Sequence, residues 1–258
     1  MMTTLLVALA QSAVIAASAA GPPQPAPTVW PIEWMKERCP PFDTGFPSVP
    51  SEIAECQVTE WGEFASFERG TYYYVLYCVV LNRDKAEDGA CADPSSLSAR
   101  YGAANAAVFV REDSSPTVRL VMSQYTGNYG GIFEKPLLVS NAYGAIMQVT
   151  MHVPSTCYCN SSTYYIWRKN TRQWQQLDWW GWQQGFDRRL PSGLESQNGF
   201  WPDLATMSAA GGLWTKDDPH CCPSGGTVDV QLGITGNRFI LKSLKVRRQP
   251  PENQERRD

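Results

Sequence analysis

The sequence predicts a mainly β protein in which antiparallel hairpins form a sandwich or barrel-like body, with one short helix and disulfide cross-links; a propeller-like arrangement is less favoured. Short apolar runs alternate with polar turns over most of the chain. One long aromatic and β-branched run is typical of a strand buried on both faces, and eight cysteines follow an apolar leader. The 258 residues, 43% of them hydrophobic, are enough to bury a substantial core.

Residues 1–20 have the features of a signal peptide. They carry no charged side chain, an apolar stretch runs from Leu5 to Ala17, and the small residues up to Ala20 supply a cleavage site. A membrane anchor would need a longer apolar stretch, and the prolines that begin at Pro22 end this one. We therefore expect an exported protein, periplasmic or extracellular, without a transmembrane segment after cleavage.

The rest of the chain divides into three parts. A proline-rich lead-in covers residues 21–50, a single β-rich domain covers 51–246, and a charged tail covers 247–258. Proline fixes φ and lacks a backbone donor, so the lead-in is expected to be extended rather than a helix or a central strand. Its aromatic residues, among them Trp30 and Trp34, predict that it lies over the domain.

The cysteines predict a disulfide framework, because all of them lie after the expected cleavage site. They are Cys39, Cys56, Cys78, Cys91, Cys157, Cys159, Cys221 and Cys222. Spacing favours two short loops, Cys39 with Cys56 and Cys78 with Cys91. The other four form two tight pairs, and a cross-link between these pairs would join the middle of the chain to its C-terminal part.

Two alternatives to that cross-link remain open. Cys221 and Cys222 can bond to each other, which would give a strained and reducible bridge. A zinc or thiol redox site is the other, but C-x-C and C-C spacings suit a single tetrahedral metal poorly. We therefore assign no metal ligand and expect no cofactor.

The strands are expected in a simple order. The run from Thr71 to Leu81 is too apolar to have one face in water. Four hairpins then follow, each made of two apolar runs around a polar turn. Their paired runs are 107–111 with 118–122, 137–140 with 145–153, 163–167 with 174–177, and 228–234 with 239–246.

One helix is expected from Asp178 to Leu190. Trp179, Trp182 and Phe186 recur toward Leu190 at helical spacing, and Asp178 can serve as the N-cap. Trp180 points away from the apolar face of such a helix, so it is expected to be exposed.

Tryptophan is the main candidate for ligand contact. Seven of the ten tryptophans lie between residues 167 and 214. An exposed indole can stack on a sugar ring or on a peptide proline, although most of these side chains are expected to fill the core. Trp180, Trp201 and Trp214 are the candidate ligand-binding residues.

The most distinctive segment runs from Asp218 to Gly226 and reads DPHCCPSGG. A structural turn is the main expectation, because Asp-Pro starts turns and the paired glycines permit backbone conformations closed to other residues. Asp217, Asp218 and His220 are also candidates for contact with a ligand or a cation. A thiolate nucleophile beside His220 is disfavoured, because a disulfide would remove the thiolate.

This segment resembles a D-x-x-C-C-P-[ST]-G motif near the C-terminus of uncharacterised exported bacterial proteins, among them a mycobacterial lipoprotein family of unknown function. Residues 174–193 are similar to the segment that precedes the motif in some of these proteins. The resemblance implies a location in the cell envelope and supplies no catalytic residue. The chain has no cysteine directly after its leader, so lipid anchoring is not implied.

These observations favour a non-catalytic domain that binds a ligand or an envelope partner. The alternatives are a secreted, carbohydrate-active hydrolase with a pair of carboxylates, and a structural envelope protein. No G-x-S-x-G, P-loop or H-E-x-x-H motif is present, and His152 is expected to be a packed or edge histidine on a strand. With 22 basic and 25 acidic residues the net charge is −3, which disfavours a nucleic-acid partner.

Overall fold

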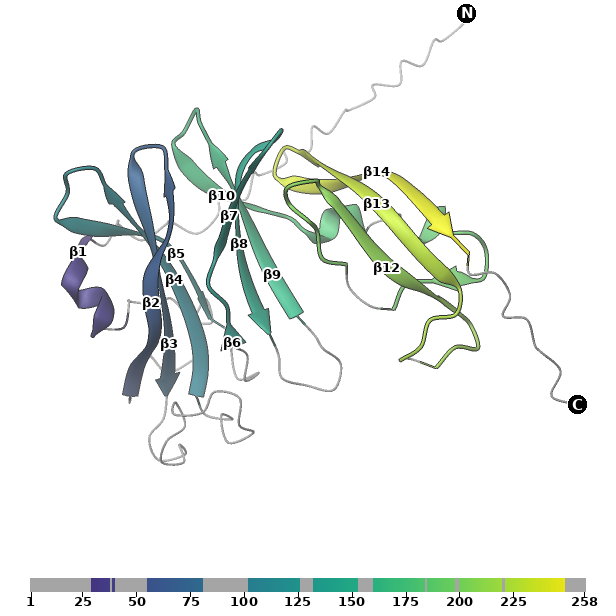
Figure 1. The fold of residues 1–258 in the computed structure, drawn as a ribbon, viewed down its shortest axis with the longest axis horizontal. Coiled ribbons are helices and arrows are strands. Elements are labelled where there is room, and N and C mark those ends of the chain that lie inside the picture. The colour runs from purple at the N-terminus through teal and green to yellow at the C-terminus, as the bar shows by residue number, and fades with distance from the viewer. Residues whose placement is uncertain are drawn as a thin grey trace, which may run out of the picture.

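The fold consists of three antiparallel β-sheets, seen in a computed structural model (Figure 1). The structure describes residues 29–37, 39, 55–80, 102–125, 132–152, 160–183, 185–197, 200–219 and 221–248. All pairings between its strands are antiparallel, which confirms the predicted fold class. No helix in these ranges is long and apolar enough to span a bilayer.

The N-terminal sheet has the order β1-β5-β4-β3-β2. Its strands are β1 (Val29–Pro31), β2 (Glu55–Phe67), β3 (Gly70–Val80), β4 (Gly102–Glu112) and β5 (Thr117–Tyr125). A five-residue 3-10 helix, η1 (Ile32–Lys36), follows β1 and was not expected in the proline-rich lead-in. Trp30 and Met35 are buried against this sheet, so the described part of the lead-in does lie over the domain.

The middle sheet has the order β10-β9-β8-β6, and β7 also pairs with β8. Its strands are β6 (Ile132–Phe133), β7 (Leu137–Asn141), β8 (Gly144–His152), β9 (Asn160–Arg168) and β10 (Gln173–Leu177). The C-terminal sheet has the order β11-β12-β13-β14. Its strands are β11 (Leu194–Glu195), β12 (Ser208–Thr215), β13 (Gly226–Thr235) and β14 (Arg238–Arg247). All four predicted hairpins are confirmed.

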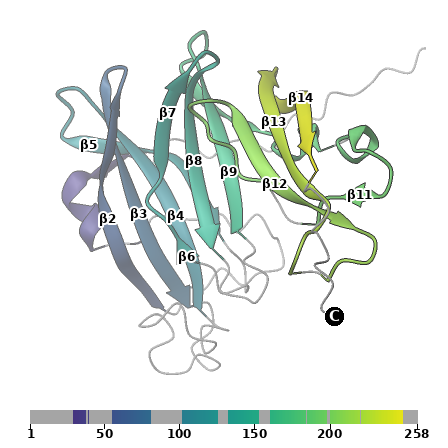
Figure 2. The same ribbon diagram turned by 45° about the vertical axis from the view of Figure 1, so that its right-hand side comes forward.

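The three sheets pack face to face in chain order, as Figures 1 and 2 show from two directions. β3 illustrates the consequence, because its successive side chains point to opposite faces. Tyr72 and Tyr74 face the middle sheet, whereas Tyr73 and Val75 face the lead-in. The run from Tyr72 to Val79 is buried throughout, as its apolar composition predicted.

The middle sheet is also covered on both faces. Met147 and Val149 of β8 pack against the N-terminal sheet, whereas Ile146 faces the C-terminal sheet.

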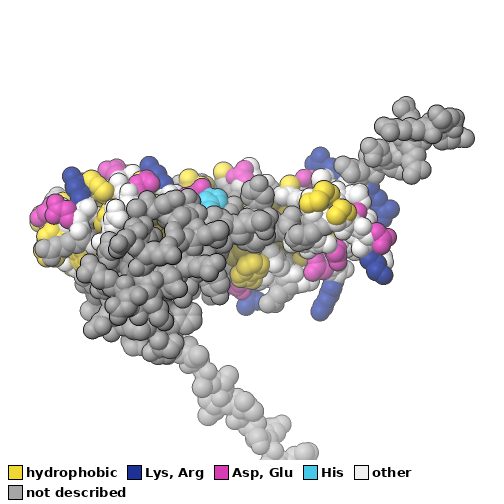
Figure 3. All heavy atoms as spheres, turned by 90° about the horizontal axis from the view of Figure 1, so that it is seen from below, with side chains coloured by type: hydrophobic (Ala, Val, Ile, Leu, Met, Phe, Trp, Pro, Cys, Tyr) yellow, Lys and Arg dark blue, Asp and Glu magenta, His cyan; other side chains and the backbone are white. Residues whose placement is uncertain are grey.

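The C-terminal sheet has one polar face, because exposed Thr227 and Gln231 alternate with buried residues along β13. Its edge strand β14 carries four basic residues and no acidic one. Positive and negative side chains are interspersed at the right-hand end of the molecule in Figure 3, the end that contains this sheet.

Two long strands were not expected from the sequence. β2 shifts register twice against β3, so its inward and outward positions do not alternate regularly. β12 contains Gly211 and Gly212, which are unfavourable in strands. Both glycines are required by close packing, because a Cβ would lie 2.4 Å from the Phe200 ring at Gly211 and 2.7 Å from Pro223 at Gly212.

The continuous helix expected from Asp178 to Leu190 is wrong. The chain forms two 3-10 turns, η5 (Trp180–Trp182) and η6 (Asp187–Arg189), separated by Gly185 at φ +97°. That φ is incompatible with an α-helix, and the backbone of Asp178 is already bonded to the β13–β14 turn. The apolar residues Trp182, Phe186 and Leu190 are nevertheless buried in the core.

The disulfides agree with the sequence only in part. Cys39 and Cys56 are bonded, with Cα atoms 6.2 Å apart, and Cys78 is also in a disulfide. Cys221 and Cys222 bond to each other on an exposed loop, so the predicted cross-link from this pair to Cys157 and Cys159 is wrong. Cys221 and Cys222 are adjacent and exposed, so a bond between them requires no movement of the sheets. Cys91, Cys157 and Cys159 lie outside the described residues.

The three-layer packing makes a testable prediction for two adjacent residues. Ile146 and Met147 are both 0% exposed although they point to opposite faces of the middle sheet. Ile146→Ala and Met147→Ala should each lower the free energy of unfolding by about 2–5 kcal/mol, measured by urea denaturation. Leu137→Ala, at a residue 52% exposed in the same sheet, should change it by less than about 0.5 kcal/mol. A negligible effect at either buried position would contradict the three-layer arrangement.

Candidate functional site

The structure separates the candidate residues rather than bringing them into one site. Trp180 is 64% exposed, as predicted, and Trp201 is 43% exposed. Trp214 is 2% exposed and belongs to the interior, so it offers no surface to a ligand. Asp217 is exposed and Asp218 is half-buried in the loop after β12, while His220 lies outside the described residues.

Asp218 organises the loop that carries the cysteine pair. Its carboxylate accepts hydrogen bonds from the Ser224 hydroxyl at 2.5 Å, the Ser224 N–H at 2.8 Å and the Thr215 N–H at 2.7 Å. These donors, the Ser224 hydroxyl first, hold the pKa of the Asp218 carboxyl well below its usual range. The carboxylate is therefore a structural acceptor inside the loop, as the expectation of a structural turn implies.

The end of the loop is fixed by close backbone packing. The Gly225 N–H donates to the Leu213 carbonyl at 2.8 Å, and a Cβ at Gly225 would lie 2.8 Å from that same oxygen. Gly226 has φ +106°, and a Cβ there would lie 2.2 Å from the Arg247 carbonyl oxygen. In the described ranges no group of three or more His, Cys, Asp or Glu residues is placed to hold a metal ion. The D-x-x-C-C-P-S-G-G segment thus has a structural explanation.

A second location has the features of a binding site. An open groove of about 440 Å³ lies where β10 ends and the chain turns into η5. Six of its lining residues are polar: Ser161, Ser162, Thr163, Gln176, Asp178 and Asn237. Leu177, Trp179 and Trp180 supply the apolar part. We call this site the Trp180 groove.

The groove exists because two paired strands have different lengths. β10 ends at Leu177, opposite Tyr164, whereas β9 begins at Asn160. The edge of β9 from Ser161 to Thr163 therefore has no β10 partner and forms one side of the groove.

The other side of the groove is held by the C-terminal sheet. The Asp178 N–H donates to the Asn237 carbonyl at 2.7 Å, and the Phe239 N–H donates to the Asp178 carbonyl at 3.0 Å. The Asp178 carboxylate accepts the Gly181 N–H at 3.1 Å, which fixes the turn that presents Trp180. The N-cap of η5 is Trp179, so the predicted N-cap role of Asp178 is wrong, although its carboxylate does bond a backbone N–H in the turn.

A rigid aromatic cluster lies beneath the groove. The Trp179 ring packs against Tyr164, Trp182 and Phe239, with ring centroids 5.2, 5.4 and 5.0 Å away. Tyr164 is 1% exposed, and burial raises the pKa of its hydroxyl to about 12, so it stays neutral at all physiological pH values. Trp180 thus projects from a well-packed base.

A second hollow of about 450 Å³ adjoins the first along β10. Its polar lining consists of Arg168, Asn170, Thr171, Gln173, Gln175 and Gln176, and Trp174 supplies its aromatic surface. Gln176 lines both sites, so they are neighbours. We call this site the Trp174 hollow.

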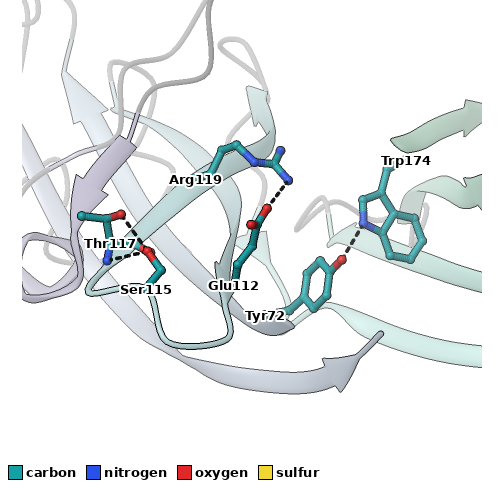
Figure 4. A network of polar contacts seen from close by, with 6 residues as sticks. All are labelled: Tyr72, Glu112, Ser115, Thr117, Arg119 and Trp174. Carbon is teal, nitrogen blue, oxygen red and sulfur yellow. Dashed lines mark hydrogen bonds and ion pairs between the residues drawn. The ribbon is translucent and has the colours of Figure 1, made fainter. Parts of the chain in front are cut away.

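Trp174 is held by contacts with the N-terminal sheet and with Trp167 of β9. Its Nε1–H donates to the Tyr72 hydroxyl at 3.3 Å, as Figure 4 shows, and its ring packs against Trp167 and Phe67. The Trp174 hollow is therefore built on a packed and hydrogen-bonded indole, whereas the Trp180 indole is largely in solvent.

The two sites contain one basic and one acidic side chain, and both are bonded internally. The Arg168 guanidinium donates to Gln175 Oε1 at 2.8 Å and to the Gly236 carbonyl. Asp178 is held by Gly181, as described above. The remaining polar lining consists of amides and hydroxyls, which donate and accept hydrogen bonds without net charge.

His152 lies apart from these sites at the end of β8, paired across the sheet with Ile132 of β6. Its Nε2 is 2.5 Å from Glu134 Oε1, and both side chains are partly exposed. His152 also pairs with Asn160 of β9, so it is a partly exposed histidine at the end of an internal strand, and the predicted packed or edge position is wrong.

Most of the groove was not found by sequence reasoning. Asp178 was interpreted only as a helix cap, and no candidate was proposed among Ser161, Thr163, Gln176 or Asn237. These residues are small or amide side chains without a motif, and they meet because Asn237 bonds the end of β10. The exposure of Trp180 was the one signal available.

Comparisons with models of known protein families, with curated proteins and with solved structures find no match to this chain. The interpretation of the site therefore depends on its own geometry.

The internal bonds of Asp218 predict a pH effect on stability. Because its pKa is lowered in the folded state, its contribution is present above the ordinary aspartate pKa of about 3.9 and decreases as the pH falls below that value. Asp218→Asn should therefore lower the urea midpoint at pH 7, and its difference from the wild type should shrink at pH 3.

The neighbouring residue supplies the control for this measurement. Asp217 is exposed, and its side chain makes no hydrogen bond to a described residue. Asp217→Asn should leave the urea midpoint unchanged at both pH values. Equal effects of the two substitutions would contradict the structural role of Asp218.

Proposed function

We propose that this chain is an exported, non-catalytic binding module and that the Trp180 groove holds its ligand. The observation that carries the proposal is the exposure of Trp180 beside a polar groove. A large indole is costly to leave in water, and an apolar plane next to hydroxyl and amide groups suits amphipathic ligands. The fixed base under Trp179 reduces the ordering that binding would require.

The composition of the groove favours binding over hydrolysis. Glycoside hydrolysis by the usual mechanisms needs two carboxyl groups about 5–9.5 Å apart across the scissile bond. The Trp180 groove and the Trp174 hollow together are lined by one carboxylate, Asp178, which also accepts the Gly181 N–H. A purely structural envelope role leaves the exposure of Trp180 without a purpose.

We also infer a location in the cell envelope or outside the cell. This inference depends on the apolar leader over residues 1–20 and on the resemblance of the segment from Asp218 to Gly226 to exported bacterial proteins. The bonded cysteine pairs are consistent with an oxidising compartment. An envelope component is the partner or ligand source that fits this location.

The binding role predicts the effect of removing the exposed indole. Trp180→Ala should weaken binding of any ligand selected on a combined glycan and peptide array by about tenfold or more, because aromatic anchors dominate such contacts. The thermal unfolding midpoint should stay unchanged, since the side chain is largely in solvent.

Trp201→Ala is the matched control, because Trp201 is exposed but does not line the groove. Binding by this variant should equal that of the wild type. An unchanged array signal for Trp180→Ala would remove the groove from the proposal.

Export predicts processing of the N-terminus. The protein recovered from the periplasm or the medium should lack residues 1–20 or nearly so, as measured by intact mass and N-terminal sequencing. A deletion of residues 5–17 should retain the chain in the cytoplasm, because it removes the apolar stretch. An unprocessed, fully reduced chain in the cytoplasm of the native cell would contradict the proposal.

A further inference from the structure

We infer that the ligand is an uncharged oligosaccharide that lies along β10 and occupies both the Trp180 groove and the Trp174 hollow. This inference depends on the proposed binding function and adds to it the chemical class and the extent of the ligand. Three features of the two sites carry it: their continuity, their aromatic surfaces and their lack of free charge.

The first feature is continuity. Gln176 lines both sites, and the exposed Gln173 and Gln175, which point to the opposite face of this edge strand, extend the lining along β10. A strand rises about 3.4 Å per residue, so the three steps from Gln173 to Gln176 cover about 10 Å before the Trp180 groove adds its own length. This path is longer than a single sugar ring.

The second feature is an aromatic surface in each site. Trp180 is exposed at one end, and Trp174 lines the hollow at the other. Sugar rings present a flat patch of C–H groups on one face and hydroxyls around the rim. Indoles can contact the C–H faces while amides and hydroxyls bond the rims.

The third feature is that both charged side chains of the two sites are hydrogen-bonded to other groups of the protein. Arg168 and Asp178 are of opposite sign, and each is bonded to neighbouring groups of the protein. An anionic ligand such as a phosphorylated compound or a polyuronide would need free basic groups. The lining therefore suits a neutral polyhydroxylated chain.

A peptide strand fits the lining less well. Peptides that add to a sheet edge gain specificity from apolar pockets for alternate side chains. The apolar lining here comprises three tryptophans and Leu177, which is 3% exposed, so hydroxyl and amide groups dominate the accessible surface. We therefore favour the oligosaccharide and treat a proline-rich peptide as an outcome that the experiment must distinguish.

The experiment measures affinity against oligomer length by calorimetry, using the full secreted chain. The probes are cello- and chito-oligosaccharides from the monosaccharide to the hexasaccharide, an oligouronide and a proline-rich peptide. For at least one neutral series, the hexasaccharide should bind about tenfold or more tightly than the disaccharide. The oligouronide and the peptide should bind more weakly than that hexasaccharide.

Two substitutions locate the ligand. Gln173→Ala lies in the Trp174 hollow alone, so it should weaken hexasaccharide binding about threefold to tenfold and leave disaccharide binding unchanged. Trp180→Ala should weaken both. Gln57→Ala, at an exposed glutamine of β2, is the matched control and should change neither.

The remaining outcomes overturn the inference in distinguishable ways. Equal affinity for the disaccharide and the hexasaccharide would confine the ligand to the Trp180 groove. Binding of the peptide or the oligouronide in preference to every neutral sugar, still sensitive to Trp180→Ala, would replace the ligand class and retain the binding function. If no ligand on the array depended on Trp180, both the inference and the proposed function would fail.

Discussion

Burial of sheets on both faces is the constraint from which the rest of the structure follows. The N-terminal and middle sheets each pack on two sides, so both the odd and the even positions of β3 must be apolar. Hydroxyls and amides cannot be placed on such faces without cost, because few partners are available there. Some that lie on these faces are hydrogen-bonded to other side chains, as Tyr72 is to Trp174 and Gln148 to Ser162, and others lie at strand ends and in turns. The Trp180 groove is one such place. It opens because β10 ends at Leu177, so the first residues of β9 have no partner strand on that side.

The groove also shows how a flexible-looking segment becomes rigid. The chain after β10 has no regular secondary structure beyond two 3-10 turns. It is held by the backbone bonds of Asp178 to the β13–β14 turn and by the packing of Trp179 and Trp182. The backbone that carries Trp180 is therefore held in place, although the exposed indole contacts little itself. A binding surface that is already ordered in the free protein loses less conformational entropy on association.

The sequence predicted the fold class, the four hairpins, the buried run around Tyr72–Val79 and the exposure of Trp180. These features depend on local patterns, namely alternation, turn residues and apolar runs. It did not predict β12. The two glycines of this strand are explained by Phe200 and Pro223, which approach them closely only in the folded chain. The helix predicted from Asp178 is absent for a similar reason. The backbone of Asp178 bonds Asn237 and Phe239, and this tertiary pairing outweighs the helical spacing of the apolar residues. The bond between Cys221 and Cys222 was one of several pairings that spacing left open.

The side of β14 that faces away from β13 has a consequence for contacts between molecules. Its first residues are covered by Asp178, which accepts the Phe239 N–H, and the rest of the strand pairs with no other described strand. A strand at the end of a sheet offers unpaired backbone groups to any other chain, and this invites sheet-to-sheet association. On β14, Arg238, Lys242 and Lys245 add positive charge along that border, whereas Arg247 is paired with Asp229 of β13. Two copies approaching along it would bring like charges into register, which opposes their pairing. Pairing of two copies along this border is thus opposed by electrostatic repulsion, which limits extension of the C-terminal sheet into fibres.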